Sequence, residues 1–301
     1  MSQVIELVPN FSEGINEDII SGLVKLAQTT PGASLLDYSA DRNHNRTVLS
    51  LVGGPQAIKE VAFNLIEYAK DHIDLTQHKG AHPRMGATDV CPLIPLKDTS
   101  IEDCVDLAQE IAKQVGEELD IPVFLYEAAA TAPHRKNIAK IRKGEFEGMA
   151  DKIKEDKWQP DYGPDQLHPT AGATAVGARM PLVAFNVNLD TDNIDLAKRI
   201  AKIVRGSSGG FKYCKAIGVM LEDRQVAQVS MNMVNYKKTP LYRVLETIRF
   251  EAKRYGVGIQ GTEIVGLTPA EALIDSANYY LQTEDFDPNH QVIENRLLSD
   301  H

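Results

Sequence analysis

The stretch ASLLDYSADRNHNRTVLSLVG at residues 33–53 decides the fold, because two strand-like segments lie on either side of a short polar loop. Residues 33–40 lead into the loop as one strand, and residues 47–53 alternate well enough for a neighbouring antiparallel strand. The loop between them, DRNHNR, contains two arginines and a histidine. We therefore expect an antiparallel strand pair whose polar loop is available to a ligand.

Helical patterns flank this strand pair on both sides. Residues 17–29 carry apolar side chains at helical spacing, and a Pro-Gly pair ends the pattern. Residues 56–70 show the same spacing, and the apolar run QVIELV at residues 3–8 adds a buried strand before the first helix. The resulting β-α-β-β-α order predicts a sheet with helices packed against one face.

A similar element order recurs in the second half of the chain, although no sequence repeat accompanies it. Prolines interrupt the strand-like residues 90–96, so we place that strand at an edge of the sheet or in a partly irregular region. Residues 158–179 lack periodicity, and their aromatic and apolar content favours an ordered loop that contacts a ligand. Other strands are expected at 122–130, 181–189, 214–221, 226–234 and 256–266, and helices at 101–118, 193–204, 239–255 and 268–281.

Together these patterns predict an α+β protein with two α/β subdomains, residues 1–179 and 180–301. Each subdomain is expected to be a mixed sheet with helices on one face, in a ferredoxin-like element order. The chain has 301 residues, which is enough for two such units with proper cores.

Composition excludes several classes of protein. No run of about 18 apolar residues is present, and the N-terminus lacks the features of a signal peptide, so we expect a cytoplasmic protein with no membrane span. A formal net charge of −10 argues against general nucleic-acid binding. The three cysteines have no CxxC spacing and are interpreted as reduced thiols.

The block HKGAHPRMGATDVCP at residues 78–92 has the strongest chemical character in the chain. Its two glycines permit backbone geometry that a side chain forbids, and Pro83 favours an extended conformation at His82. Lys79 and Arg84 flank that histidine, so we expect a lowered pKa and a neutral imidazole. We interpret the block as a catalytic loop that presents His82, and a plain surface histidine is the alternative.

The spacing of His78 and His82 also matches a pair of metal ligands on one helix face. Gly80 and Pro83 disfavour that helix, and the glutamate of an HExxH motif is missing. We therefore expect no metal. Arg42, His44 and Arg46 form a second group of positive charge, for which a solvated loop is the alternative.

Several motifs, taken in order, resemble the formiminotransferase family over nearly the whole chain. They are VPNFSEG at 8–14, NRTV at 45–48 with VG at 52–53, the block at 78–92, GP at 163–164, and VGAR at 176–179 followed by LVAFNVNL at 182–189. The block at 78–92 is the most specific of them. The resemblance implies two subdomains that face each other across a substrate groove, a homodimer, and tetrahydrofolate as co-substrate.

The implied reaction moves the formimino group from N-formimino-L-glutamate to N5 of tetrahydrofolate, in histidine degradation and one-carbon metabolism. A histidine suits the required proton transfers near neutral pH, and no metal is required. Two alternatives remain open. One is formyl transfer between 5-formyltetrahydrofolate and glutamate at the same site, and the other is a folate-binding module without catalysis.

The resemblance assigns the acid/base role to His82. Charge and loop position add Arg46 and Arg84 as clamps for substrate carboxylates, Lys79 as a further positive charge, and Asn10 and Ser12 as groups that orient the formimino group. The folate-contacting segment of the family falls on Gly163, Pro164, Asp165, Gln166, Leu167, His168, Pro169, Thr170, Ala171 and Gly172.

Overall fold

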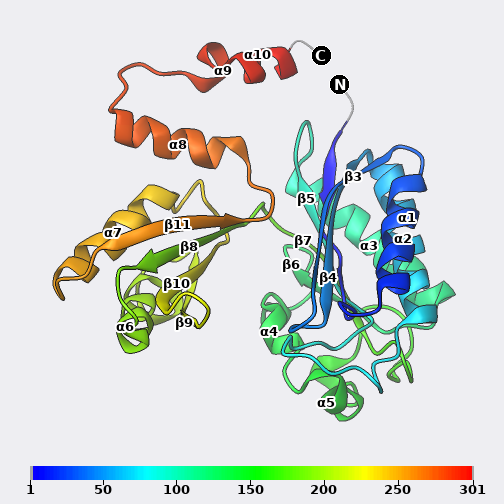
Figure 1. Cartoon of the computed structure of the whole chain (residues 1–301). Helices are drawn as coiled ribbons and strands as arrows, with labels where there is room; N and C mark the ends of the chain where they lie inside the picture. The colour runs from blue at the N-terminus through cyan, green and yellow to red at the C-terminus, as the bar shows by residue number, and fades with distance from the viewer. Residues whose placement is uncertain (1–2, 300–301) are drawn as a thin grey trace. The chain divides into compact units, whose positions relative to one another are not determined.

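The computed structural model describes residues 3–299, which divide between Arg179 and Met180 into two compact units. Within those residues the first unit is built on a seven-stranded sheet and the second on a four-stranded sheet, each with helices (Figure 1). The predicted α+β class with two subdomains is thereby confirmed. No helix in the described part of the chain is long and apolar enough to cross a membrane.

The first unit alternates strands and helices as predicted for its first half. Its elements are β1 (Ile5–Leu7), β2 (Asn10–Phe11), α1 (Glu17–Thr29), β3 (Ala33–Asp41), β4 (Arg46–Gly53), α2 (Pro55–His72), β5 (Thr88–Pro95), α3 (Ile101–Glu118), β6 (Val123–Glu127), α4 (Ile138–Ile141), α5 (Glu145–Lys152) and β7 (Thr174–Ala178).

Helices α1, α2 and α3 cover one face of the first sheet (Figure 1). Alternate residues of β4, including Leu49 and Leu51, point into this core and are fully buried. Local signals set the helix ends. Asn16 caps α1 through its side chain, and Ser100 and Asp103 form a capping box at the start of α3.

Strand β5 lies in the interior of the sheet, so the edge position is wrong, whereas the predicted irregularity is present as a register shift in its pairing with β2. It pairs with β1 and β2 on one side and with β7 on the other. A proline removes one donor from a sheet ladder, which usually confines it to an edge. Here Pro92 lies opposite Val8 in the interruption between β1 and β2, where its carbonyl oxygen accepts the Val8 N–H at 3.1 Å and no ladder bond from its own nitrogen is needed.

The prediction of an unbroken loop over residues 158–179 is also wrong in part, because β7 forms there. This strand pairs in parallel with both β5 and β6, and all five of its residues are buried. Its sequence, TAVGA, is too short and too poor in large apolar residues to give a strand pattern. A small residue is required at Gly177, where a Cβ atom would lie 2.4 Å from the Tyr126 carbonyl oxygen.

The second unit repeats the strand order of the first. Its elements are β8 (Val183–Leu189), α6 (Ile194–Val204), β9 (Cys214–Leu221), β10 (Val226–Met233), α7 (Leu241–Lys253) and β11 (Ile259–Val265), followed by α8 (Ala270–Leu281), α9 (Pro288–Gln291) and α10 (Ile293–Ser299).

The spatial order β11-β8-β10-β9 is the ferredoxin-like arrangement, with all its pairings antiparallel. The first unit has the equivalent order β3-β4-β1/β2-β5, and β7 and β6 extend it by parallel pairing. Parallel pairs among the described strands thus belong to the first sheet.

A small layer covers part of the face of the first sheet that α1, α2 and α3 leave open. Residues of α4 and α5, with Trp158, pack against β5, β6 and β7 in a separate apolar cluster. This layer matters for function because it brings the segment after α4 next to the block at 78–92. The three cysteines, Cys91, Cys104 and Cys214, are buried and free, and burial raises the pKa of each thiol to about 12.

Candidate functional site

Three of the sequence motifs meet at Asn45 in the first unit: VPNFSEG at 8–14, the polar loop at 41–46 and the block at 78–92. The Asn45 side chain accepts a hydrogen bond from the Gly14 backbone N–H and donates one to the Lys79 carbonyl oxygen. The backbone N–H groups of Ala81 and His82 donate to carbonyl oxygens of the loop after β3. The two groups of positive charge predicted from the sequence, around Arg46 and around His82, are therefore brought together.

Close backbone contacts hold the block at 78–92 in place. A Cβ atom on Gly80 would lie 2.4 Å from the His44 carbonyl oxygen, and one on Gly86 would lie 2.1 Å from the Ala173 carbonyl oxygen. The buried Ser12 hydroxyl donates to the Gly86 carbonyl oxygen at 2.7 Å. This contact gives Ser12 a structural partner, while the Asn10 amide donates to the Val8 carbonyl oxygen.

His82 lies beside a buried ion pair. Its Nε2 atom is 3.5 Å from Asp89 Oδ2, and the same oxygen accepts a hydrogen bond from Arg142 Nη2 at 2.5 Å. Asp89 Oδ1 accepts the Met85 backbone N–H at 2.9 Å. The carboxylate is 1% exposed, and its position at the start of the interior strand β5 leaves it little freedom to move.

The pKa of His82 is lowered, as predicted, but for a different reason. Burial is the largest cause. The contact with Asp89 and the negative charge of Asp89 oppose the shift, and the charges of Arg46 and Arg142 add to it. Lys79 and Arg84, the residues expected to cause the shift, are not among these influences. The imidazole is therefore neutral near pH 7 and is able to accept a proton.

Unsatisfied buried polar atoms gather around His82. Within residues 3–299, they include His82 Nε2, Arg46 Nε and Arg142 Nε, which are buried and have no hydrogen-bond partner. Burial, followed by the charge of Arg142, lowers the pKa of the Arg46 guanidinium. Buried donors normally have partners, and two arginines side by side repel each other. The arrangement suits an anionic ligand that brings acceptor oxygens to this place.

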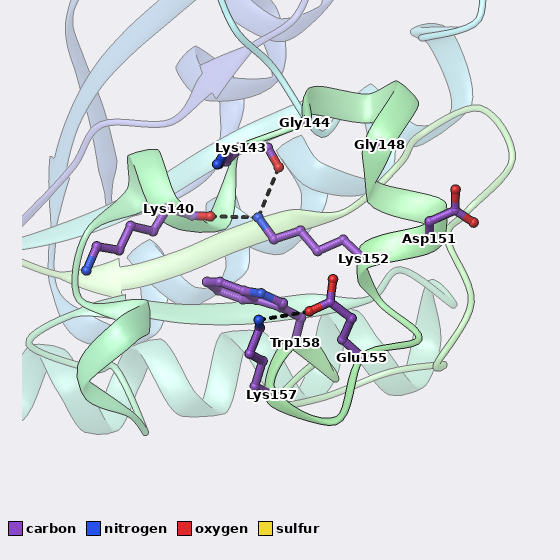
Figure 2. Close-up of a pocket in the computed structure, with 9 residues that line it drawn as sticks. All are labelled: Lys140, Lys143, Gly144, Gly148, Asp151, Lys152, Glu155, Lys157 and Trp158. Atoms are coloured by element: carbon purple, nitrogen blue, oxygen red, sulfur yellow. Dashed lines mark hydrogen bonds and ion pairs between the residues drawn. The ribbon is translucent and has the colours of Figure 1, made fainter.

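Lys152 fixes the chain on either side of Arg142. Its ammonium group donates to the carbonyl oxygens of Lys140 and Lys143 at 2.6 and 3.1 Å, and it lies 4.2 Å from the centre of the Trp158 ring (Figure 2). Burial lowers the pKa of Lys152 to about 8. All three ammonium protons have acceptors, because the Ile141 carbonyl oxygen is the third. The lysine therefore acts as a support for Arg142.

The Arg84 guanidinium is already engaged by two acidic side chains. It contacts both carboxylate oxygens of Glu147 at 2.7 and 2.8 Å and one oxygen of Glu145 at 3.1 Å. Hydrogen bonding to Glu147 is the largest cause of the raised pKa of Arg84. Arg84 Nε also donates to His78 Nδ1, while Lys79 is exposed. This geometry favours a role for Arg84 in holding α5 against the block, in place of the predicted substrate clamp.

The segment 163–172 reaches the block through its last residues. Gly86 and Gly172 form a β-bridge, and the Ala171 carbonyl oxygen accepts the Ala87 N–H at 2.8 Å. At the other end, Gly163 packs against Gly116 of α3. His168 turns inward on its own loop and accepts the Ala171 N–H, and burial is the largest cause of its lowered pKa. Asp165, Gln166 and Pro169 are exposed.

Two residues of this site had no assigned role in the sequence interpretation, namely Asp89 and Arg142. Asp89 lies within the conspicuous block, and a carboxylate directly before a buried strand was the signal available. Arg142 is one of several basic residues in a surface-like segment, so its pattern carried no such signal. In the described residues, no group of three or more His, Cys, Asp or Glu side chains is arranged to hold a metal ion.

Family models cover both units. The description "Formiminotransferase domain, N-terminal subdomain" matches residues 4–179, and "Formiminotransferase domain" matches residues 184–296. These two ranges correspond to the two compact units of the structure.

Curated proteins extend the likeness over nearly the full chain. A glutamate formimidoyltransferase of Streptococcus pyogenes serotype M1 is 62% identical over 99% of this chain and 100% of its own length. A glutamate formimidoyltransferase of Thermoplasma acidophilum is 45% identical over 98% of this chain and 97% of its own. The formimidoyltransferase-cyclodeaminase of Mus musculus is 42% identical over 94% of this chain, which spans 53% of that protein.

Proposed function

Because the chain belongs to the formiminotransferase family, we propose that it transfers the formimino group of N-formimino-L-glutamate to N5 of tetrahydrofolate. The observation that carries this proposal is the 62% identity, over the full length, to a protein named glutamate formimidoyltransferase. The chain is thus a transferase of one-carbon groups. We place the reaction in histidine degradation and one-carbon metabolism, with a homodimer in the cytoplasm as the working state.

The chemistry requires two proton transfers around one carbon atom. N5 of tetrahydrofolate attacks the formimino carbon, a tetrahedral intermediate forms, and the bond to the glutamate nitrogen breaks. His82 takes the proton from N5 and returns a proton to the departing amine. A neutral imidazole with a lowered pKa is suited to the first of these steps. Neither step requires a metal or a covalent enzyme intermediate.

Arg46 is our choice for the donor carboxylate. In N-formimino-L-glutamate the α-carboxylate is only a few bonds from the reacting carbon, so its binding group must lie close to His82. Arg46 is close enough for its charge to lower the pKa of His82, and its Nε atom is buried without a partner among the described residues. Binding the carboxylate here would provide the missing acceptor.

Tetrahydrofolate is proposed to contact the segment from Gly163 to Gly172. Support comes from the bridge between this segment and the block, since Gly172 pairs with Gly86 four residues after His82. The remaining members of the segment, and Asn10 with Ser12, stay proposals for contacts with the substrates. Ser12 acts through the Gly86 carbonyl oxygen in the free enzyme.

A donor comparison tests the proposed reaction. Purified enzyme is incubated with tetrahydrofolate and N-formimino-L-glutamate, and formation of the 5-formimino product is followed by absorbance. The same enzyme is incubated in parallel with 5-formyltetrahydrofolate and glutamate. We expect turnover of the formimino donor to exceed formyl transfer by at least about tenfold in kcat/KM. Faster formyl transfer would favour the second reaction, and folate binding without turnover would favour a binding module.

Replacing Arg46 and replacing Arg84 should have different effects on substrate binding and on stability. Arg46→Gln should raise KM for N-formimino-L-glutamate about tenfold or more, because a charge-assisted contact with the carboxylate is lost. Arg84→Gln should leave that KM within about twofold and instead lower the melting temperature, since its ion pairs to Glu145 and Glu147 hold α5 against the block. Steady-state kinetics with both substrates varied separates the two outcomes. A raised KM in Arg84→Gln alone would restore Arg84 as the clamp.

A further inference from the structure

We propose that Asp89 is the positioning residue of His82, which deepens the proposed function and rests on it. In this assignment the Asp89 carboxylate accepts the Nε2–H of the neutral imidazole. The other ring nitrogen, Nδ1, is then unprotonated and is the atom that accepts the proton from N5 of tetrahydrofolate. The ring nitrogen facing Asp89 thus determines which atom of His82 carries out the transfer.

The first support is the geometry around Nε2. Of the two ring nitrogens, Nε2 is the buried one without a hydrogen-bond partner among the described residues, and Asp89 Oδ2 is the carboxylate oxygen that faces it at 3.5 Å. This separation is longer than an ordinary hydrogen bond. Catalytic hydrogen bonds are commonly long in the free enzyme and shorten when the substrate binds.

The second support is that Asp89 itself cannot turn away. Its Oδ1 atom accepts a hydrogen bond from the Met85 N–H, and its Oδ2 atom accepts a hydrogen bond from Arg142 Nη2. The backbone on either side of Arg142 is held by Lys152, whose ammonium group donates to the carbonyl oxygens of Lys140, Ile141 and Lys143. The carboxylate is therefore held in one orientation by a hydrogen bond to each of its two oxygens.

Arg142 also explains why the proton stays on His82. A buried carboxylate without a cation competes for the imidazole proton, because burial disfavours its charge. The guanidinium stabilises the negative charge of Asp89, so the carboxylate accepts a hydrogen bond without being protonated. The groups that influence His82 by charge are Asp89, Arg46 and Arg142. Asp89 acts to raise the pKa of His82, whereas the two arginines act to lower it.

The tautomer of His82 in the wild-type enzyme provides a test that requires no turnover. Long-range ¹H–¹⁵N correlation spectra report which imidazole nitrogen carries the proton. We expect the His82 resonances, assigned by their loss in His82→Ala, to show the Nε2–H tautomer above the pKa. An Nδ1–H tautomer would overturn the assignment even if formimino transfer is observed. Equally, failure of the transfer assay would leave this spectroscopic result standing.

The second test is Asp89→Asn, compared with Asp161→Asn as a matched control. Asp161 is also a buried carboxylate of the first unit, it pairs with Arg135 at 2.6 Å, and it accepts the Leu125 N–H. The control therefore has a similar structural cost with no contact to His82. Each variant is studied by NMR titration of His82 and by the pH dependence of kcat.

Asp89→Asn should lower kcat between about tenfold and a thousandfold, with KM values within about twofold of wild type. The pKa of His82 should fall further, because the carboxylate that raises it is gone. Asp161→Asn should leave the His82 titration unchanged. If Asp89→Asn loses activity while the His82 pKa and tautomer stay as in wild type, Asp89 is a structural residue and the proposal is wrong. An equal shift in both variants would contradict it as well.

Discussion

Replacing His82 with alanine is expected to lower kcat for formimino transfer by about two orders of magnitude or more, with tetrahydrofolate binding retained. The reason is that the alanine variant has no group at this place to take the proton from N5 and to protonate the departing amine. The side chain is only 12% exposed, so bulk water does not easily replace it. The measurement combines the absorbance assay with equilibrium binding of tetrahydrofolate.

His72→Ala is the matched control for this prediction. His72 lies at the end of α2, where its ring contacts the Tyr68 carbonyl oxygen and stacks on the Tyr68 ring. Its removal should leave kcat within about twofold of wild type, as for an ordinary surface change. If His82→Ala retains wild-type kcat, the acid/base role is wrong. If neither the wild type nor the variant turns over while both bind folate, the chain is a binding module.

Replacing Gly86 with alanine is expected to destabilise the protein by about 2–3 kcal/mol and to reduce activity at the same time. The added methyl group would lie 2.1 Å from the Ala173 carbonyl oxygen and 2.7 Å from that of Thr88, and both are backbone atoms that cannot rotate aside. The block must therefore move away from β7, and the Ser12 contact to the Gly86 carbonyl oxygen is disturbed. Urea unfolding gives the free energy, and the transfer assay gives the activity.

Gly148→Ala separates this steric effect from a general effect of glycine replacement. Gly148 lies inside α5, and no heavy atom lies within 4 Å of the place where its Cβ atom would be built. Alanine is favoured over glycine in a helix interior, so this variant should be about 0.5–1 kcal/mol more stable than wild type. Unchanged stability of Gly86→Ala, with the control stabilised as expected, would show that the block adapts and that the close approach is not required.

The longer helices of this protein were predictable because their signals are local, whereas α9 and α10 near the end of the chain were not predicted. Residues 17–29 and 101–118 have apolar side chains at helical spacing and capping residues at their starts, and the observed α1 and α3 have the same bounds. The strand pair around residues 33–53 was predictable for a similar reason, since its short polar loop makes the two strands neighbours in the chain. The order of these elements was sufficient for the fold class.

The interior of the first sheet was less predictable, because its pairings are not local. Nothing in TAVGA marks β7 as a strand, and it is stabilised by parallel partners on both sides that are distant in the chain. The prolines of β5 indicated an edge, but Pro92 lies opposite the break between β1 and β2, and Pro95 ends the strand beyond its pairing with β7. In both cases the partner strand, not the strand's own residues, determined the outcome.

In the candidate site, too, the features with local signals were predictable and those that depend on distant residues were not. The sequence by itself singled out His82, predicted the direction of its pKa shift, and marked the loops that meet around Asn45, because glycine, proline and charged residues at close spacing are a local pattern. Only the tertiary structure decided which charges face His82. Arg142 reaches Asp89 across 53 residues of chain, and Arg84 turns instead to Glu147. Electrostatic influence depends on distance and burial in three dimensions, and neither quantity is contained in the spacing of residues along the chain.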